Sequence, residues 1–469
     1  MTGLARAGTV FERALCASPL CVPSRGSLMT GLLPSRTGAI DNAGELPASI
    51  PTFAHRLRLL GYRTVLTGKM HFVGPDQLHG FEERPMTDVY PAGLDWVPDW
   101  NLSDDERLPW YHDLSSVLRA GPVRATLQMD YDEEVAFQAR RVLVDAAREP
   151  SRPLLLVASF THPHDPYEVP ARLWDLYDHV AIPPLRQPAP PEPPDPSTRR
   201  LRAMVDADGT AVSPEQVAAA RRAYRAAITL VDEHVATLLE TLDTQGLRDD
   251  TVVVVTSDHG DMLGERGLWY KMAPFEPSIR VPLIVSGPGI GRGRRVAQPV
   301  SLLDLAPTLV ELGGGSVYDD GELDGRSLAR ALRGDPLPPR DVAIEYLAEG
   351  VRSPQVTLVR GDLKLIRTLG EPDLLYDLAA DPDEAHDIAG DPLRAADLAA
   401  LATEADRRWN LEQLDADVRA SQARRRLVAA ALATGAVTAW DHPTPGDGAT
   451  RYIGTGCDFW STLERSRRV

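Results

Sequence analysis

The cysteine at position 21 opens the segment whose residue types and spacing point most strongly to chemistry. Residues 21–25 read Cys-Val-Pro-Ser-Arg, and Thr30-Gly31 follow closely. By itself, a cysteine before a proline is more often an inert buried thiol than a nucleophile. A helix that begins within residues 27–31 would aim backbone N–H groups and the positive end of its dipole at Cys21. The segment is therefore a candidate site for an anionic group.

Lysine and histidine residues occur in two further polar segments. Lys69 and His71 follow an apolar-rich stretch, and two residues apart they point the same way if the chain is extended. His162 and His164 lie in residues 161–167, directly after a predicted strand. Exposed polar residues at such strand ends are commonly functional. The simpler interpretation is a solvated lysine with histidines that cap or pack.

An acidic residue and a third histidine follow another predicted strand. Asp258 and His259 are adjacent, and Lys271 comes twelve residues after His259. An Asp-His pair alone is weak evidence for a metal site, since a hard ion needs more oxygen ligands than one carboxylate supplies.

The elements that must position these residues read as a mixed α/β pattern. Short apolar runs at residues 154–160, 251–256 and 281–286 predict buried strands, and residues 214–244 predict a long helix. Strand, helix and strand in this order predict a parallel sheet with crossover helices, in which ligands bind at strand ends. Residues 4–15 have apolar positions at roughly helical spacing, which predicts a helix there.

A change of pattern near residue 340 predicts a second, smaller domain. Short alternating strands at residues 342–346, 356–360 and 363–367 are followed by helical stretches. The chain of 469 residues is also long for a single core. We therefore expect a catalytic domain over residues 1–340 and a C-terminal domain over residues 341–469.

The composition disfavours several classes of partner. A formal net charge of −17 repels nucleic-acid phosphates and anionic membrane surfaces. No stretch of about 18 apolar residues predicts a membrane span. Three cysteines are too few for a disulfide framework, and residues 1–17 lack the pattern of a signal peptide. We expect a cytoplasmic protein that binds neither nucleic acid nor membrane.

The eleven residues 21–31, Cys-Val-Pro-Ser-Arg-Gly-Ser-Leu-Met-Thr-Gly, resemble the signature of the sulfatase family. The resemblance implies an alkaline-phosphatase-like α/β/α sandwich with a mostly parallel central sheet, plus a smaller C-terminal α+β domain with a small antiparallel sheet. It also implies that a separate maturation enzyme, of the formylglycine-generating or an equivalent kind, oxidises Cys21 to formylglycine. The hydrate of that aldehyde has two hydroxyl groups on one carbon, one to attack sulfur and one to expel the product.

The resemblance also implies a catalytic role for five candidate residues. Arg25 is placed to stabilise the oxygen atoms at position 21. Lys69 contacts sulfate and the formylglycine oxygen, His71 takes the proton that starts elimination, and Lys271 contacts sulfate. His164 binds sulfate and helps to protonate the leaving oxygen, a role suited to a group that titrates near neutrality.

A divalent cation is implied as well. Asp258, His259 and Cys21 match the family's metal ligands, and oxygen-rich ligands favour Ca²⁺, with Mg²⁺ or Mn²⁺ as alternatives. Family members open with an apolar strand that ends in two adjacent aspartates, whereas residues 1–20 contain no aspartate. We expect these carboxylates upstream of Met1. The alternative is an inactive, N-terminally truncated remnant.

Longer segments resemble choline-sulfatases in particular: residues 17–21 with 34–39 and 41–42, residues 69–84, and residues 95–100. The implied activity is hydrolysis of choline-O-sulfate to choline and sulfate. An arylsulfatase or a phosphonate monoester hydrolase remains the alternative, because these enzymes share one core. Residues 419–435 and 440–452 resemble the C-terminal extension of choline-sulfatases, which reaches a neighbouring subunit and implies a homo-oligomer, a dimer or a tetramer. The resemblance fades over residues 454–469.

Three residues, Asn42, His112 and Glu349, match positions that contact choline in that family, and Trp96 is chosen beside them for its aromatic ring. A trimethylammonium group cannot donate hydrogen bonds, so aromatic faces and a carboxylate are its best partners. Trp96 is the expected aromatic contact and Glu349 the expected counter-charge, with Asn42 and His112 as further contacts. Each of them could instead be an ordinary packing or surface residue.

Overall fold

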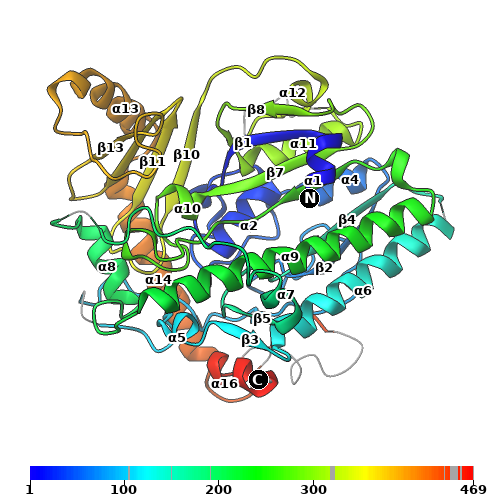
Figure 1. The fold of residues 1–469 in the computed structure, drawn as a ribbon, viewed down its shortest axis with the longest axis horizontal. Coiled ribbons are helices and arrows are strands. Elements are labelled where there is room, and N and C mark those ends of the chain that lie inside the picture. The colour runs from blue at the N-terminus through cyan, green and yellow to red at the C-terminus, as the bar shows by residue number, and fades with distance from the viewer. Residues whose placement is uncertain are drawn as a thin grey trace.

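Strands from distant parts of the chain form the centre of the molecule (Figure 1). The first sheet has the order β6 (Val253–Thr256), β7 (Arg280–Ser286), β1 (Thr9–Leu15) and β8 (Arg294–Val296), and β9 (Val300–Ser301) also pairs with β1. β8 and β9 run parallel to β1, whereas β7 runs antiparallel to both of its neighbours. A second, parallel pair joins β2 (Arg63–Gly68) to β4 (Leu154–Ser159). These facts come from a computed structural model that describes all residues except 104–105, 149, 191, 317–322, 438, 444–452, 455–456 and 468–469.

The expected α/β class is confirmed, including a mostly parallel central sheet and a small antiparallel sheet near the C-terminus. The three predicted buried strands are present as β4, β6 and β7. Within the described part of the chain, β4 pairs with β2 and β6 pairs with β7, but β4 and β6 do not pair with each other. Both remain partly exposed along their whole length. Each therefore presents an open edge towards the middle of the molecule.

The prediction of a helix over residues 4–15 is wrong. A helix, α1, spans Thr2–Ala7, and β1 follows it directly. β1 exchanges backbone hydrogen bonds with β7 on one side and with β8 and β9 on the other. Tertiary pairing of this kind overrides a weak helical period.

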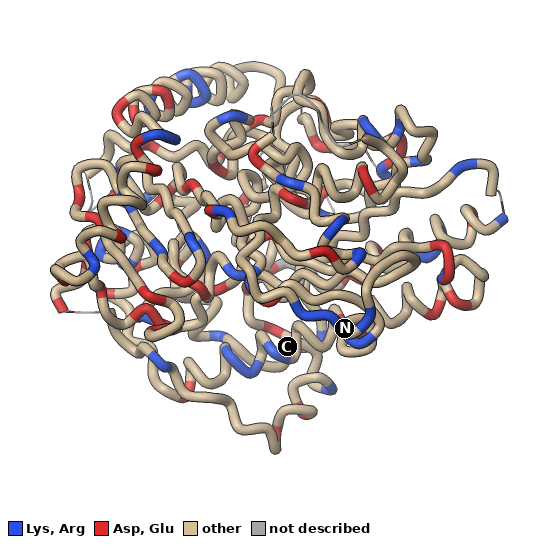
Figure 2. The backbone as a smooth tube through the Cα atoms, turned by 90° about the horizontal axis from the view of Figure 1, so that it is seen from above, with Lys and Arg blue, Asp and Glu red and all other residues tan. Residues whose placement is uncertain are grey.

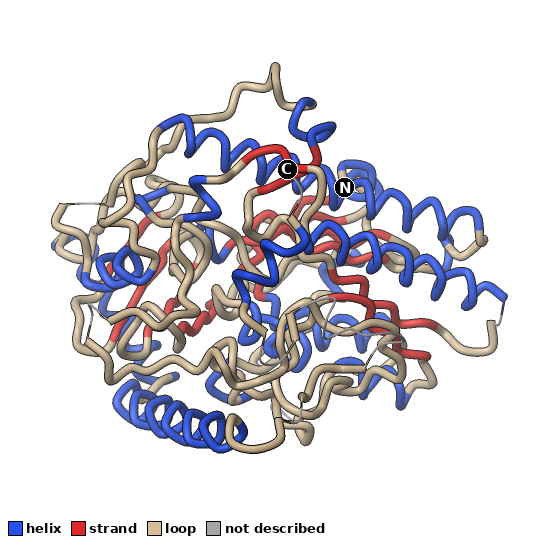
Figure 3. Tube along the Cα trace, turned by 90° about the horizontal axis from the view of Figure 1, so that it is seen from below, coloured by secondary structure: helices blue, strands red, loops and turns tan. Residues whose placement is uncertain are grey.

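Helices lie outside the strands (Figure 3). The two longest in the first 300 residues are α6 (Leu127–Arg148) and α9 (Pro214–Thr244), which is the predicted helix with its bounds unchanged. Ser213 and Gln216 form a capping box at its start, and Pro214 occupies the first turn, where the missing N–H costs nothing. The shorter elements are α2 (Cys21–Thr30), α3 (Pro34–Thr37), α4 (Phe53–Leu59), α5 (Ser115–Leu118), α7 (Ala171–Asp175), α8 (Pro196–Met204), α10 (Glu276–Ile279), α11 (Leu305–Leu312), α12 (Ala329–Arg333), and the parallel pair β3 (Gly121–Val123) and β5 (Glu168–Pro170).

The C-terminal part of the chain begins with an antiparallel sheet. It has the order β10 (Asp341–Tyr346), β11 (Gln355–Arg360), β12 (Leu363–Thr368) and β13 (Leu374–Asp377), of which β13 was not predicted. The helices described after this sheet are α13 (Ala395–Arg408), α14 (Leu411–Leu432) and α16 (Phe459–Ser466). The division proposed at residue 340 coincides with the start of β10. Residues 444–452 of the predicted C-terminal extension lie outside the described residues.

Acidic and basic residues are interspersed over the molecule (Figure 2). None of the helices in the described ranges is both long enough and apolar enough to cross a membrane.

Candidate active site

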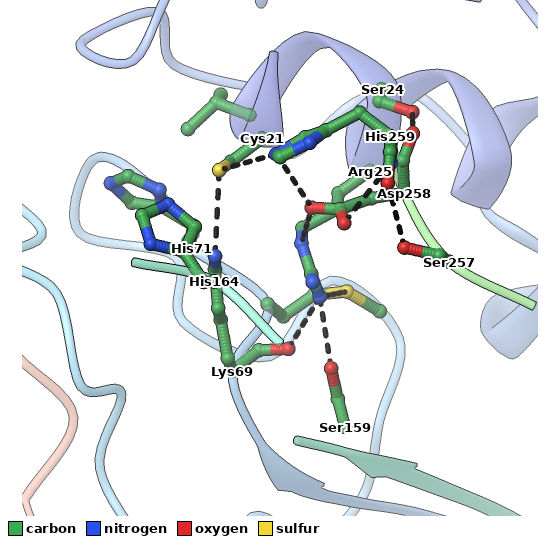
Figure 4. A network of polar contacts seen from close by, with 12 residues as sticks. Cys21, Ser24, Arg25, Lys69, His71, Ser159, His164, Ser257, Asp258 and His259 are labelled. Atoms are coloured by element: carbon green, nitrogen blue, oxygen red, sulfur yellow. Dashed lines mark hydrogen bonds and ion pairs between the residues drawn. The ribbon is translucent and has the colours of Figure 1, made fainter. Parts of the chain in front are cut away.

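Cys21 lies at the N-terminus of α2, with its thiol between two basic side chains (Figure 4). Lys69 Nζ donates to Sγ over 3.4 Å, and His259 Nε2 lies 3.3 Å from the same sulfur. Burial alone would raise the pKa of the thiol, but the charges of Lys69, His259 and Lys271 hold it well below its ordinary value. An anionic atom at this position is therefore stabilised from several sides.

The helix begins at Cys21 and not within residues 27–31 as expected. Leu20 is extended, and Pro23 falls in the first helical turn, where a proline does not interrupt the hydrogen bonds of the helix. The earlier start places Cys21 itself, and not a later residue, at the positive end of the helix dipole.

Arg25 joins three segments that converge beneath the thiol. Nε donates to Asp258 Oδ2 over 2.8 Å, and Nη1 donates to Ser159 Oγ over 2.9 Å and to Lys69 O over 2.7 Å. Ser159 ends β4 and Asp258 follows β6, so one guanidinium spans the open edge between these strands. The structure thus gives Arg25 a holding role, and its predicted action on oxygen atoms at position 21 stays a prediction.

Lys69 and His71 follow β2 at a turn that requires Gly68. Gly68 has a φ of +97°, and a Cβ there would lie 2.1 Å from Ser159 O. The chain beyond is not extended as expected, because His71 has a φ of +58°. Both side chains nevertheless lie beside Cys21 (Figure 4). Burial holds the pKa of His71 below its ordinary value despite the nearby thiol, so its imidazole is a neutral proton acceptor.

Two carboxylates that the sequence analysis did not single out hold the backbone of these motifs. Asp88 Oδ2 accepts from the backbone N–H groups of Met70 and His71, each over 2.7 Å. Asp132, on α6, accepts from Thr161 N over 2.6 Å and contacts His162 Nδ1 over 2.7 Å. The sequence gives no sign of either holding role, because Asp132 is distant in sequence from the motif that it contacts and Asp88 lies in a segment without regular secondary structure. His162 is accordingly a packed residue.

His164 and Lys271 are close neighbours. His164 Nε2 lies 2.7 Å from Lys271 Nζ, and His164 Nδ1 lies 3.0 Å from the buried carboxylate of Asp165. Burial and Lys271 act to lower the pKa of His164, but the contact with Asp165 outweighs them and raises it. The imidazole can therefore hold a proton near neutrality, as a general acid must.

Asp258, His259 and Cys21 form a cluster in which one ligand atom from each lies within 4.8 Å of the others. The set supplies a single carboxylate, and that carboxylate already pairs with Arg25. Burial would raise the pKa of Asp258, but Arg25 and His259 hold it far below its ordinary value. Ca²⁺ takes about six to eight oxygen ligands, and Mg²⁺ needs a near-ideal octahedron. This donor set by itself does not make a complete site for a hard divalent cation.

Aromatic rings pack around His71 and His164. Trp96 stands edge-on to His71, with ring centroids 5.5 Å apart. His112 lies 6.3 Å from His164 by ring centroids, and burial with the charge of Lys271 lowers the pKa of His112 to about 3. It is therefore neutral at physiological pH. Asn42 accepts a hydrogen bond from Val22 N over 3.2 Å, directly after the nucleophile position.

Tyr90, Phe459 and Trp460 belong to the same aromatic group but were not predicted for it. The ring of Tyr90 lies 4.7 Å from Lys69 Nζ, and its hydroxyl lies 3.5 Å from His164 Nδ1. Phe459 stacks on Tyr90 at 6.0 Å, and the neighbouring Trp460 is edge-on to the ring of His112 at 6.2 Å. A lone tyrosine has no spacing signal, and Phe459 and Trp460 lie in the segment where the resemblance fades.

Glu349 is a buried carboxyl within electrostatic reach of Cys21 and Lys271. Its side chain has an exposed fraction of 3%, and Oε2 has no hydrogen-bond partner among the described residues. Burial, together with the charge of Asp41, raises the pKa of Glu349 to about 8, and Lys271 and Cys21 also act on it electrostatically. A buried carboxylate without a counter-charge is unfavourable, so an incoming cation would be stabilised here.

Sequence and structure comparisons agree with this geometry. The "Sulfatase" family model matches residues 1–315, and the "Choline sulfatase enzyme C terminal" model matches residues 416–468. The choline-sulfatase of Rhizobium meliloti (strain 1021) is 44% identical over 478 residues, which cover 100% of this chain and 93% of that protein. An arylsulfatase of Clostridium perfringens is 25% identical, over 68% of this chain and 70% of its own length.

Solved structures show the same fold. The phosphonate monoester hydrolase from Silicibacter pomeroyi superposes with a TM-score of 0.68 at 24% identity, over 87% of this chain and 89% of that chain. A putative sulfatase from Bacteroides thetaiotaomicron gives a TM-score of 0.67 at 23% identity, over 95% and 92% of the two chains. With a family model that covers two thirds of its length and a relative that is 44% identical throughout, the chain belongs to the sulfatase family, the sulfuric ester hydrolases.

Proposed function

We propose that this sulfatase hydrolyses choline-O-sulfate to choline and sulfate. One observation carries the proposal: basic side chains, aromatic rings and a buried carboxyl lie together around a single nucleophile position, and the carboxyl oxygen Oε2 of Glu349 has no hydrogen-bond partner among the described residues. Lys69 and Lys271 suit a sulfate group, whereas Trp96, Tyr90 and Glu349 suit a trimethylammonium group. The 44% identity to a choline-sulfatase supports the same substrate.

The residue at position 21 is proposed to act as formylglycine. Cys21 Sγ stands where the hydroxyl oxygens of the aldehyde hydrate would lie, and the cations that lower the pKa of the thiol would equally stabilise an oxyanion. When present, the hydrate supplies two hydroxyl groups, one to attack sulfur and one to expel the product. Oxidation of Cys21 requires a maturation enzyme, which is a predicted partner.

The surrounding residues divide the proton transfers between them. Lys69 and Lys271 hold the sulfate oxygens and balance their charge. His164, protonated because of Asp165, donates its proton to the ester oxygen as the bond from sulfur to that oxygen breaks. His71, neutral because of burial, accepts the proton released when sulfate departs from position 21. Each of these roles suits the protonation state that its environment favours.

The alternative activity, an arylsulfatase or phosphonate monoester hydrolase, also has an observation in its favour. With a pKa raised to about 8, Glu349 is largely protonated at neutral pH in the free enzyme. A neutral carboxyl accepts an uncharged leaving group more readily than a charged carboxylate would. The comparison of a cationic with an uncharged substrate therefore separates the two activities.

Further parts of the proposal concern the metal, the assembly and the compartment. A hard cation, Ca²⁺ before Mg²⁺ or Mn²⁺, is proposed, although it needs oxygen donors beyond Asp258.

A homo-oligomer, a dimer or a tetramer, is supported by the exposed apolar residues Leu427, Val428 and Leu432 on α14. Cys16, Cys21 and Cys457 take part in no disulfide among the described residues, which suits a cytoplasmic location. The catalytic domain is proposed to end at residue 340.

Two measurements test the proposed function. Mass spectrometry of the peptide that contains Cys21, from active protein made together with a maturation enzyme, should find an aldehyde in place of the thiol. Free thiol alone in active protein would refute the formylglycine mechanism. The value of kcat/KM should be higher for choline sulfate than for an uncharged aryl sulfate, and the reverse preference would favour the alternative activity.

A further inference from the structure

Helix α14 contacts the site from outside through one polar face. Residues Val418, Gln422 and Arg425 lie at spacings of four and three, so they share a side of the helix. Val418 and Gln422 are fully buried, with exposed fractions of 2% and 0%. A buried glutamine and an arginine on the packed face of a helix are costly unless they are hydrogen-bonded. Their partners therefore show what the helix holds.

Arg425 holds the turn that lies beside the nucleophile. Its two terminal nitrogens donate to Asp41 Oδ1 over 2.6 Å and to Asp41 Oδ2 over 2.7 Å, and the carboxylate is completely buried. Asp41 Oδ1 also accepts from Ala43 N over 3.0 Å, which closes a turn around Asn42. Asn42 in turn accepts from Val22 N, as described above. One ion pair thus connects α14 to the start of α2.

Gln422 holds the loop that follows Trp96. Its Oε1 accepts from Trp100 N over 3.0 Å, and the indole Nε1 of Trp100 donates to Ala348 O over 2.8 Å, next to Glu349. Arg419 reinforces this contact, because it donates to Trp100 O over 2.9 Å and to Arg352 O over 2.6 Å. Trp100 therefore connects the loop that contains Trp96 to the loop that contains Glu349. Gln422 connects both loops to α14.

We propose that Gln422 and Arg425 are positioning residues, through which α14 sets the geometry of the leaving-group side of the site. Neither residue is placed in contact with substrate by any of these bonds. The helix acts on Asn42, Trp96 and Glu349 from behind, while the sulfate side is held by Arg25 and the strand ends. The selectivity part of this inference rests on the proposed function, whereas the positioning part does not.

Amide hydrogen exchange tests the positioning part without any substrate. Gln422→Met keeps the size and burial of the side chain but removes the acceptor for Trp100 N. We expect faster exchange in residues 95–101 and also in residues 346–351, to which no hydrogen bond of Gln422 is found among the described residues. Faster exchange confined to Trp100 would show a merely local bond and overturn the inference.

Arg425 needs variants that separate positioning from misfolding. Arg425→Gln leaves the carboxylate of Asp41 buried and unpaired, so the double variant Asp41→Asn with Arg425→Gln is measured beside it. Arg424→Gln is the matched control, because it removes the same charge from the exposed neighbouring position. Arg425→Lys keeps the charge but loses the bidentate geometry, and we expect it to restore part of the function.

Kinetics of the mature, full-length enzyme test the selectivity part. For Arg425→Gln, for the double variant and for Gln422→Met, we expect kcat/KM for choline sulfate to fall about tenfold to a hundredfold. The value for an uncharged aryl sulfate should change less than threefold, roughly the scatter of surface changes. Equal losses on both substrates in folded protein, or no loss, would overturn the inference. A wild-type enzyme without preference for choline sulfate would instead refute the proposed function, and the exchange experiment would still decide the positioning role.

Discussion

The sulfate side and the leaving-group side of the site are built in different ways. On the sulfate side, Cys21, Lys69 and His164 lie at or next to the ends of α2, β2 and β4, and their polar contacts span 2.7 to 3.4 Å. On the leaving-group side, Trp96 and Glu349 lie in irregular segments that α14 holds from behind, and the ring of Trp96 contacts those of His71 and Tyr90 at 5.5 and 5.8 Å. The difference implies that the chemistry and the selectivity of the enzyme can be damaged separately.

The largest expected effect is the loss of hydrolysis for both classes of substrate. Cys21→Ser should lower kcat by at least about 10³-fold for choline sulfate and for an aryl sulfate alike, because a single hydroxyl cannot expel sulfate. Binding of sulfate should change little. Steady-state kinetics and sulfate titration give the two quantities, and Cys457→Ser, at an exposed cysteine, is the control. Sustained turnover by Cys21→Ser would contradict the assigned nucleophile.

The next effect concerns the metal, which would act on the sulfate side alone. With one carboxylate in the cluster of Asp258, His259 and Cys21, this chain should bind Ca²⁺ weakly, with Kd on the order of 10⁻³ M. Isothermal titration calorimetry measures it, with Asp258→Asn as the variant that should abolish the heat. Micromolar affinity of this chain would show that the donor set has been underestimated.

Substitutions on the leaving-group side should separate the two substrates. Trp96→Ala and Glu349→Ala should each lower kcat/KM for choline sulfate by roughly tenfold to a hundredfold, because they remove an aromatic face or a counter-charge from the cation. Hydrolysis of an uncharged aryl sulfate should be affected far less. If both substrates suffer equally, then the two residues support the nucleophile and do not select the substrate.

The smallest expected effect is a pH dependence that belongs to the leaving-group side. Since the pKa of Glu349 is raised to about 8, its carboxyl gains charge as pH rises from 6 to 8. The ratio of kcat/KM for choline sulfate to that for aryl sulfate should therefore rise, by at most about tenfold per pH unit, and level off above pH 8. Taking the ratio cancels the titration of His164, and Glu349→Gln should make the ratio flat.

The raised pKa of Glu349 also affects the stability of the folded protein, and this contribution falls as pH rises. The folded-state pKa of Glu349 lies above that of an unfolded glutamate, so the folded state holds the proton more tightly. The stability that this group contributes is complete at low pH and is lost as pH rises through about 8. Glu349→Gln should remove this part of the pH dependence in chemical unfolding, and an unchanged profile would show that Glu349 does not titrate there.

The sequence by itself determined the family and the polar motifs of the sulfate side. Cys21, Lys69, His164 and Asp258 stand next to helix or strand ends, and short-range signals such as Pro, Gly and apolar runs mark those ends. The α/β class and the bounds of α9 followed from the same local patterns.

The tertiary structure decided what depends on contacts between distant residues. Pairing with β7, β8 and β9 made residues 9–15 a strand despite their helical spacing. The positive φ of His71, the holding contacts of Arg25 and Asp88, and the aromatic group around Tyr90 have no local signature. The same holds for the pKa of Glu349 and for the contacts of Gln422 with Trp100, because burial and long-range hydrogen bonds exist only once the chain has folded.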